Sequence, residues 1–325
     1  VVTVGVGFTG SIIAAEAVQA GLTVVGLERG EFRTRDDFWH IHDEWRYAVN
    51  YGLMQDLSKE TITFRNHADM RALPIRRLGS FLLGDGLGGA GVHWNGMNFR
   101  FFPYDFEIKT KTEERYGKDK MSKDYLLKDW GLTYDELEPY YTKFEELIGC
   151  SGEAISPFDG KRSKPYPCKA MVKTPQMAMF EEATKRLGYH PYTVPAGIVT
   201  EPYTNQYGVD LDPCAYCGYC ERFACEYNAK AMPLNTALPK AQQSDKYELR
   251  CNANVLEVIK KGKKVTGVRY INTLTGEEFI QPADIVVLCS YVMNNAKLLM
   301  LSKIGKQYNP KNGKGTLGKN YCYQI

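Results

Sequence analysis

Four cysteines lie close together in this chain, and thiols at this density can hold a redox-active metal cluster. Cys214, Cys217, Cys220 and Cys225 fall within twelve residues, with the spacing C-x2-C-x2-C-x4-C. Iron–sulfur clusters need several thiolates that converge from one compact loop. Structural zinc sites more often use two CxxC or CxxH pairs separated by a longer stretch. The spacing therefore favours an iron–sulfur cluster with three or four thiolate ligands, and leaves zinc and disulfides as alternatives.

A glycine-rich turn near the N-terminus has the spacing of a dinucleotide-binding motif. Gly5, Gly7 and Gly10 form GxGxxG between an apolar strand, 1–4, and a helical stretch, 11–20. The first glycine allows the tight turn, the second lets the backbone approach a diphosphate, and the third lets helix and strand pack closely. The N-terminus of the helix then favours the negative charge of the diphosphate.

Glu28 follows the second predicted strand, 23–27, and completes this motif. A carboxylate at this place can accept hydrogen bonds from ribose hydroxyls. The alternative is an ordinary turn between strand and helix, with a solvated Glu28. The motif alone does not choose between FAD and NAD.

A second glycine-dense segment, residues 79–100, surrounds His93. Glycine at this density, among large apolar side chains, indicates backbone packed closely against a ligand. A histidine beside tryptophan is usually a packed, hydrogen-bonded ring, so only these surroundings make His93 a candidate cofactor contact. The other histidines are expected to be structural or exposed: His40, His42, His67 and His190.

Other reactive side chains are expected to have structural roles. The adjacent acids Glu145 and Glu146 lie on a predicted helix and are expected to be solvated. The basic run 260–264 is expected to form a hairpin turn. The scattered cysteines are expected to be buried as small apolar residues: Cys150, Cys168, Cys251, Cys289 and Cys322.

The elements that would position these residues follow a strand–helix–strand order. A capping box at Thr133–Glu136 begins a helix that runs to about Ile148. A short helical stretch is expected within 229–243, followed by strands at 247–251, 255–259 and 265–270. The strand 283–289 is apolar apart from Asp284, as in a strand buried in a parallel sheet, and a helix follows over 294–301. We therefore predict an α/β fold with a Rossmann-like domain.

The composition is that of an ordinary globular protein. The 325 residues are 44% hydrophobic and 24% charged, and this length allows two domains. A net charge of +3 is too small to indicate nucleic-acid binding. No apolar run approaches the ~20 residues of a membrane-spanning helix, and no signal peptide is visible. Because a strand begins at residue 1 and no element closes the chain, we expect the N-terminal part of a longer protein.

Several segments resemble the glucose–methanol–choline (GMC) flavoprotein oxidoreductases. The resemblance lies in residues 5–10, 27–30, 84–96 and 301–305. The cysteine loop narrows it to the bacterial, membrane-linked sugar and sugar-acid dehydrogenases, in particular those that oxidise gluconate. Similar segments also occur at 56–65, 113–117, 187–192 and 318–321, so the resemblance covers essentially the whole chain.

The resemblance implies FAD rather than NAD as the cofactor. It places the diphosphate at the first glycine turn and the adenosine ribose at Glu28. The adenine would lie at the Val255 backbone, with Cys289 and Ser290 at the same end, and the isoalloxazine would lie along the second glycine segment. Relatives with a comparable cysteine loop carry a [3Fe-4S] cluster, and some relatives bond the flavin covalently through a histidine, for which His93 is the candidate. The implied FAD residues are Gly5, Gly7, Phe8, Thr9, Gly10, Glu28, Arg29, Gly88, Gly89, His93, Trp94, Asn95, Gly96, Val255, Cys289 and Ser290.

The family also implies how the chain is divided into domains. Residues 1–105 and 246–307 would form the FAD-binding domain, and 106–245 an α+β cap or substrate domain with the cluster loop at 213–228. Residues 308–325 would begin a missing C-terminal region. That region carries the family's catalytic histidine with an asparagine or a second histidine, so no catalytic residue is expected in this chain.

The implied activity is the oxidation of D-gluconate to 2-dehydro-D-gluconate. Electrons would pass from FAD through the cluster to a cytochrome c subunit and the quinone pool. A small subunit carrying the export signal would bring the enzyme to the periplasmic face of the membrane, which it would contact only through its partners. The alternatives are the same machinery acting on glucose, fructose, sorbitol or another polyol, a soluble oxidase, and a non-catalytic fragment with zinc at its cysteines.

Overall fold

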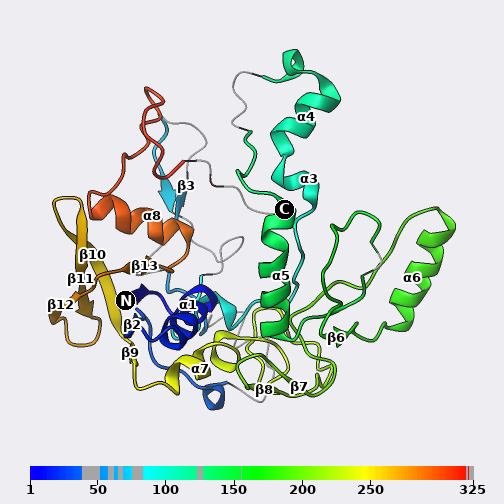
Figure 1. Ribbon diagram of the computed structural model, residues 1–325, viewed down its shortest axis with the longest axis horizontal. Coiled ribbons are helices and arrows are strands. Elements are labelled where there is room, and N and C mark those ends of the chain that lie inside the picture. The colour runs from blue at the N-terminus through cyan, green and yellow to red at the C-terminus, as the bar shows by residue number, and fades with distance from the viewer. Residues whose placement is uncertain are drawn as a thin grey trace. The chain divides into compact units, whose positions relative to one another are not determined.

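The computed structural model of the chain describes residues 1–38, 52–57, 62–64, 69–74, 83–122, 127–154, 156–319 and 321 (Figure 1). The chain divides into two compact units. Unit 1 comprises Val1–Asn95, Gly218–Glu226 and Met232–Ile325, and unit 2 comprises Gly96–Cys217 and Tyr227–Ala231. His40, His42, His67 and Cys322 lie outside the described residues.

Unit 1 contains a four-stranded parallel sheet in the order β13-β1-β2-β9. Parallel neighbours need a crossover connection, and α1 supplies it between β1 and β2, packing on both strands and on α7. The predicted strand–helix–strand opening is therefore confirmed. The elements are β1 (Val2–Val4), α1 (Phe8–Gln19), β2 (Val24–Leu27), α7 (Leu238–Gln242), β9 (Tyr247–Arg250) and β13 (Val286–Leu288).

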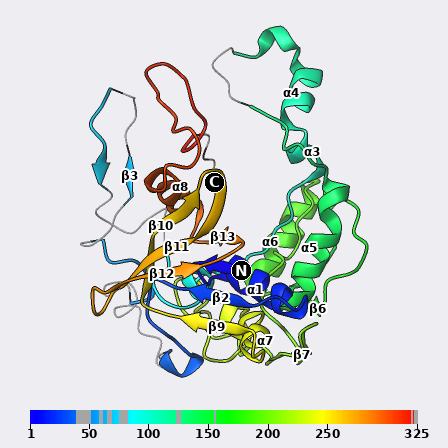
Figure 2. The ribbon, with the colours of Figure 1, turned by 60° about the vertical axis from the view of Figure 1, so that its left-hand side comes forward.

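A three-stranded antiparallel sheet of unit 1 follows β9 along the chain and packs against α8. Its strands are β10 (Ala253–Lys261), β11 (Lys264–Asn272) and β12 (Glu278–Pro282), and α8 spans Val292–Leu301. Figure 2 shows these strands side by side, with α8 against β10. The predicted hairpin turn is confirmed, because β10 ends at Lys261 and β11 begins at Lys264. Buried side chains of both sheets and of α8, such as Val4, Val268 and Leu298, form one core.

The expectation that the 283–289 strand is fully buried is wrong. Residues 286–288 do pair in parallel with β1, but all three are only half-buried. The reason is position: β13 stands at the end of the described sheet, with β1 as its one strand neighbour. Shorter elements complete unit 1: η1 (Arg35–Asp37), β3 (Thr63–Phe64), β4 (Leu73–Pro74), η2 (Gly89–Gly91) and η4 (Pro233–Asn235).

Unit 2 is built around the helix α5, Tyr134–Ile148. The predicted capping box is present: Thr133 Oγ1 accepts from the Glu136 N–H at 3.2 Å, and the Glu136 carboxylate accepts from the Thr133 N–H at 2.7 Å. Gly149 ends the helix with a φ of +58°. The remaining elements are α3 (Pro103–Phe106), α4 (Ile108–Tyr116), η3 (Lys118–Lys120), β5 (Ser151–Gly152), β6 (Cys168–Lys169), α6 (Pro175–Arg186), β7 (Tyr203–Thr204) and β8 (Asp210–Leu211).

The helix α6 was not predicted, although its ends carry recognisable signals. Thr174 caps it by accepting from the Met177 N–H at 3.3 Å, and Pro175 occupies its first position. None of its residues is buried, so α6 adds no side chain to a buried core.

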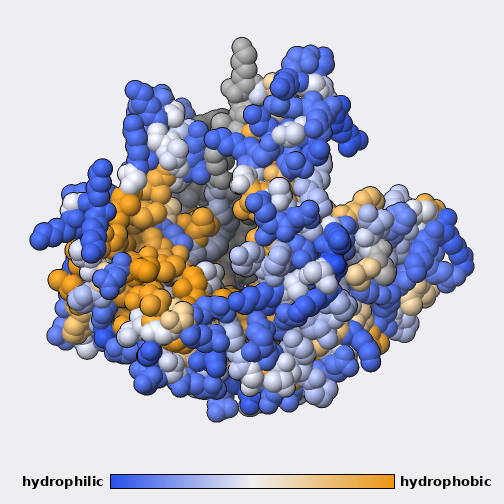
Figure 3. All heavy atoms as spheres, viewed as in Figure 1, coloured by the Kyte–Doolittle hydropathy of each residue, from blue (hydrophilic) through white to orange (hydrophobic). Residues whose placement is uncertain are grey.

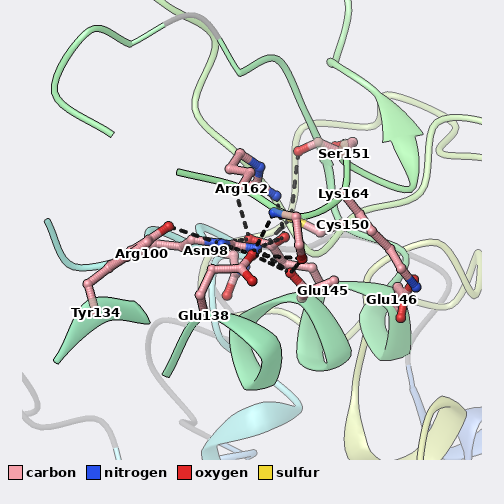
Figure 4. Close-up of polar contacts among 12 residues, drawn as sticks. Asn98, Arg100, Tyr134, Glu138, Glu145, Glu146, Cys150, Ser151, Arg162 and Lys164 are labelled. Atoms are coloured by element: carbon pink, nitrogen blue, oxygen red, sulfur yellow. Dashed lines mark hydrogen bonds and ion pairs between the residues drawn. The ribbon is translucent and has the colours of Figure 1, made fainter. Parts of the chain in front are cut away.

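The expectation that both acids of the Glu145–Glu146 pair are solvated is wrong for Glu145. Its side chain is only 3% exposed, and it forms a two-point ion pair with Arg100, with both N···O distances at 2.8 Å (Figure 4). Arg162 pairs with the same carboxylate and lies 3.8 Å from the centre of the Tyr166 ring. Only Glu146 behaves as expected, since it pairs with the exposed Lys164.

Glu138 adds a second buried carboxylate to this ion network of unit 2. It accepts from Arg100 Nη1 at 3.0 Å and from the Ser163 N–H at 3.0 Å, one turn of α5 before Thr142. Burial opposes the ionisation of Glu138, but these hydrogen bonds outweigh it and lower its pKa to about 2. Each charge of the network therefore has a partner of opposite sign.

Candidate cofactor site

A cavity of about 410 Å³ lies in unit 1, at the carboxyl ends of three parallel strands. Its wall includes the residues that directly follow β1, β2 and β13. Open α/β sheets bind ligands at this end of their strands. The described lining residues are Val4, Gly5, Val6, Gly7, Phe8, Thr9, Leu27, Glu28, Arg29, Leu83, Gly84, Gly89, Ala90, Gly91, Ala253, Asn254, Val255, Cys289, Ser290, Tyr291, Asn294, Lys297, Leu298 and Leu301.

The three glycines of the N-terminal turn have different structural roles. A Cβ on Gly10 would lie 2.0 Å from the Gly5 carbonyl oxygen, and one on Gly5, whose φ is +91°, would lie 2.8 Å from the Cys289 carbonyl oxygen. These two glycines are therefore required by backbone packing. A Cβ on Gly7 would meet only the Gly88 carbonyl oxygen, at 3.6 Å, so the space beside Gly7 belongs to the cavity.

The helix α1 points its N-terminus at this cavity. Gly7 is its N-cap and provides no side-chain cap, and Phe8 and Thr9 of the first turn line the wall. The N–H groups and the dipole at such a terminus favour an anion. The turn therefore has the geometry to hold a diphosphate.

The second glycine segment packs directly onto the first. The Gly88 N–H donates to the Val6 carbonyl oxygen at 3.1 Å, and a Cβ on Gly89 would approach Gly7 Cα at 3.9 Å. Gly89–Gly91 and Gly84 line the cavity. The structure thus brings together the two glycine-rich stretches that the sequence singled out.

Several predicted cofactor residues lie outside the lining of this cavity. Gly10, Gly88, His93, Trp94 and Asn95 belong to unit 1 but are not in its wall, and Gly96 belongs to unit 2. Trp94 packs edge-on against Phe8, with ring centres 5.5 Å apart, so it supports a wall residue from behind. His93 is buried at 3% exposure, and its carbonyl oxygen accepts from the Arg222 N–H at 2.9 Å.

Glu28 lines the cavity and also braces it. One carboxylate oxygen accepts from the Val6 N–H and the other from the Gly30 N–H, each at 3.0 Å. Burial raises the pKa of Glu28, and these hydrogen bonds oppose the rise. Each oxygen has a second lone pair, so Glu28 can still accept from a ligand hydroxyl. The sequence did not indicate the bracing role.

The far wall carries four polar residues that the sequence analysis missed. Asn254 comes from the start of β10, and Tyr291, Asn294 and Lys297 come from the start and first turns of α8. In the sequence, only their position next to or within the strand predicted at 255–259 and the helix predicted at 294–301 pointed to them. The neighbouring Cys289 lines the cavity as a neutral thiol, because burial raises its pKa to about 11.

Apolar side chains border the same wall. Figure 3 shows apolar side chains gathered over α8 and the neighbouring strands. On α8 and just before β13, Val292, Leu301 and Ile285 are more than half exposed. Leu298 and Leu301 continue this surface into the cavity. The cavity therefore combines a glycine-built polar end with an apolar wall, which suits a nucleotide with a large ring system.

The structure does not gather the four loop cysteines into a described metal site. Cys214 and Cys217 belong to unit 2, and Cys220 and Cys225 to unit 1. Within the described residues, no group of three or more His, Cys, Asp or Glu side chains is placed to hold a metal ion, and no disulfide occurs. Cys214 Sγ accepts from the Tyr216 N–H at 3.3 Å, and Tyr216 has a φ of +54°.

The scattered cysteines divide into two classes. Cys150 and Cys168 are buried as predicted, whereas Cys251 and Cys289 are only half-buried. The exposed His190 agrees with its predicted role. In the described part of the chain, no helix is long and apolar enough to cross a membrane.

Residues 127–325 match the family model for GMC oxidoreductase. The chain belongs to the GMC oxidoreductase family. This confirms the predicted family.

Two curated relatives and two solved structures give the range of similarity. The chain is 41% identical, over 342 aligned residues, to the gluconate 2-dehydrogenase flavoprotein of Pantoea cypripedii, covering 99% of this chain and 55% of the relative. It is 29% identical, over 217 residues, to the fructose dehydrogenase large subunit of Gluconobacter japonicus, covering 62% of this chain and 37% of that protein. The chain thus spans about half the length of the gluconate relative.

The solved structures support the fold alone. A pyridoxine 4-oxidase from Mesorbium loti matches with a TM-score of 0.54 and 19% identity, over 94% of this chain and 52% of that one. An Aspergillus oryzae formate oxidase matches with a TM-score of 0.55 and 19% identity, over 94% of this chain and 47% of that one. The predicted α/β fold class is confirmed.

Proposed function

We propose that this chain is the flavoprotein part of an FAD-dependent dehydrogenase that oxidises D-gluconate to 2-dehydro-D-gluconate. The observation that carries the proposal is the cavity at the sheet's carboxyl end, with open space at Gly7 in a glycine turn, in a chain 41% identical to a gluconate 2-dehydrogenase flavoprotein. FAD, when bound, accepts the two electrons released as the secondary alcohol becomes a ketone.

The cavity residues divide the binding of FAD among them. The N–H groups of Phe8 and Thr9, with the open face of Gly7, hold the diphosphate at the N-terminus of α1. Glu28 accepts from the adenosine ribose, Arg29 lies beside it, and the Val255 backbone meets the adenine. Gly5 and Gly10 keep the turn tight, while Cys289 and Ser290 close the wall against it.

The isoalloxazine half is assigned to the second glycine segment. Gly88, Gly89, His93, Trp94, Asn95 and Gly96 are its proposed contacts, and His93 is the candidate for a covalent bond. An acid-stable flavin in the unfolded, precipitated protein, lost in His93→Ala, would support the bond. Flavin that is fully released by acid would rule it out.

The cysteine loop is the proposed next electron carrier. The compact spacing of Cys214, Cys217, Cys220 and Cys225 favours an iron–sulfur cluster, [3Fe-4S] by family resemblance, and the N–H bond to Cys214 is of the kind that stabilises cluster thiolates. From there electrons would pass to a cytochrome c subunit and the quinone pool. A small subunit with the export signal would bring the chain to the periplasm.

Anaerobic reduction of the flavin tests the proposal. Addition of D-gluconate to the FAD-loaded full-length enzyme should bleach the absorbance near 450 nm, with glucose, fructose and sorbitol as matched controls. Bleaching by one of the controls but not by gluconate would keep the family and reject the substrate. Iron with acid-labile sulfide supports the cluster, whereas zinc at the same cysteines contradicts it.

A further inference from the structure

Among the described lining residues of the cavity other than glycine, Tyr291 alone has a positive φ. Its φ of 73° and ψ of 147° border a region that is essentially restricted to glycine. It lies between β13 and α8, where the chain leaves the parallel sheet. Residues held in such conformations persist only where their surroundings fix them, and they cluster at ligand-binding sites.

Hydrogen bonds on both sides of Tyr291 fix this turn. Asn295 Oδ1 accepts from the N–H and the hydroxyl of Ser290, at 2.9 and 2.8 Å. The Asn295 N–H donates to the Tyr291 carbonyl oxygen at 2.8 Å. None of these bonds uses the aromatic ring, and glycine at residue 291 would keep them without strain. The aromatic ring is therefore not needed to stabilise the turn, which favours a role for it in binding a ligand.

The place of Tyr291 in the wall points to the adenosine half of the cofactor. Gly5 packs against Cys289 and Ser290, so Tyr291 follows directly on the wall of the diphosphate turn. The helix that it begins, α8, packs on β10, whose residue Val255 lines the same cavity at the proposed adenine end. Tyr291 is still 37% exposed, so its ring has surface left to bury.

We propose that Tyr291 stacks its ring on the adenosine half of bound FAD, a contact that rests on the proposed cofactor site. The Tyr291 hydroxyl lies 2.8 Å from the Tyr321 hydroxyl, and this hydrogen bond orients the ring. Stacking of a base on an aromatic side chain contributes about tenfold or more in affinity. Tyr291 is thus a binding residue that the glycine motif does not reveal.

Two substitutions at residue 291 separate the ring from the strain. Tyr291→Ala removes the ring and keeps the Cβ, whereas Tyr291→Gly removes the ring and also relieves the strain. Both should weaken the binding of FAD, and of ADP as a probe of its adenosine half, by about tenfold. Without cofactor, the Tyr291→Gly variant should have a melting temperature about 2 °C or more above that of the Tyr291→Ala variant. Tyr291→Phe and the matched control Tyr321→Phe each break the hydroxyl pair but keep an aromatic ring at residue 291, so both should retain most of the affinity for ADP.

The dissociation constants decide between the outcomes. Equal affinity of wild type and Tyr291→Ala for FAD would overturn the stacking proposal. A loss for FAD with no loss for ADP would overturn its assignment to the adenosine half. A wild-type chain that binds neither FAD nor ADP would instead reject the proposed cofactor site, and with it this inference.

Discussion

The cavity of unit 1 is shaped by backbone, whereas the ion network of unit 2 is built from side chains. At the cavity, Gly5 and Gly10 determine how closely two backbone segments approach, and Gly7 leaves space open beside them. In the network, Arg100 pairs with Glu138 and Glu145 on α5, which lie 38 and 45 positions further along the chain. The cavity depends on residues spaced closely in the sequence, so its glycines could be predicted. The ion network joins residues that are distant in the sequence, so it is seen only in the folded chain.

The two regions should also respond differently to mutation. A backbone-built cavity can lose its ligand while the fold survives, if the added atom points into open space. A buried network of paired charges loses stability as soon as one partner is removed, because the remaining charge stays buried without compensation. Four predictions test this contrast.

The largest effect is expected for Glu145→Gln. This change leaves Arg100 paired with Glu138 alone and removes the carboxylate that pairs with Arg162, and it should cost about 3–5 kcal/mol in the free energy of unfolding. Glu146→Gln is the matched control on the next residue, and loss of its exposed pair with Lys164 should cost less than about 1 kcal/mol. Urea unfolding of both variants measures the difference. Similar costs for the two would show that the network does not stabilise unit 2.

The second effect separates two glycines of one motif. Gly10→Ala should destabilise the chain by about 2–3 kcal/mol, because its Cβ would lie 2.0 Å from the Gly5 carbonyl oxygen. Gly7→Ala should fold with nearly wild-type stability, yet bind FAD at least about tenfold more weakly because the methyl group occupies the diphosphate space. Urea unfolding and a fluorescence titration with FAD measure the pair. Unchanged FAD affinity in Gly7→Ala would contradict the proposed diphosphate-binding site beside Gly7.

The third effect is a dependence of stability on pH through Glu138. Its pKa falls from the usual 4.5 to about 2 in the folded chain, so the stabilisation is complete above about pH 4.5 and is lost as the pH falls towards 2. Wild type should exceed Glu138→Gln in unfolding free energy by about 1–2 kcal/mol at pH 6, and the gap should close by pH 2. A difference in unfolding free energy between the two proteins that stays constant from pH 6 to pH 2 would show that ionised Glu138 does not provide the stabilisation.

The smallest effect is expected at the start of α5, which carries both network carboxylates. Thr133→Ala removes the capping hydrogen bond to the Glu136 N–H and should cost about 0.5–1 kcal/mol. Thr133→Ser keeps the hydroxyl and serves as the control. A cost for Thr133→Ala as large as that of Glu145→Gln would mean that the helix end, rather than the ion pairs, limits the stability of unit 2.

Local signals allowed much of the fold to be predicted. The glycine turn, the capping box at Thr133, the hairpin at 260–264 and the parallel strand before α8 are each determined by a few neighbouring residues. The helix α6 was missed because it lies in a segment rich in Pro and Tyr, where only Thr174 and Pro175 mark its start.

The candidate site was predictable only in its glycine half. Gly7 and Glu28 could be placed from their spacing after predicted strands. Tyr291, Asn294 and Lys297 could not, because their membership of the wall depends on how α8 packs on β10. Glu145 was misjudged for the same reason: its partners Arg100 and Arg162 are distant in sequence, and an acid on a helix is usually solvated.

Titration of the apoprotein with FAD and with FMN tests the central claim most directly. The account assigns the cavity to the adenosine diphosphate half, so one FAD should bind per chain, ADP should compete with it, and FMN, which lacks that half, should bind far more weakly. FMN that binds as tightly as FAD, or FAD that ADP cannot displace, would contradict the assignment of this cavity.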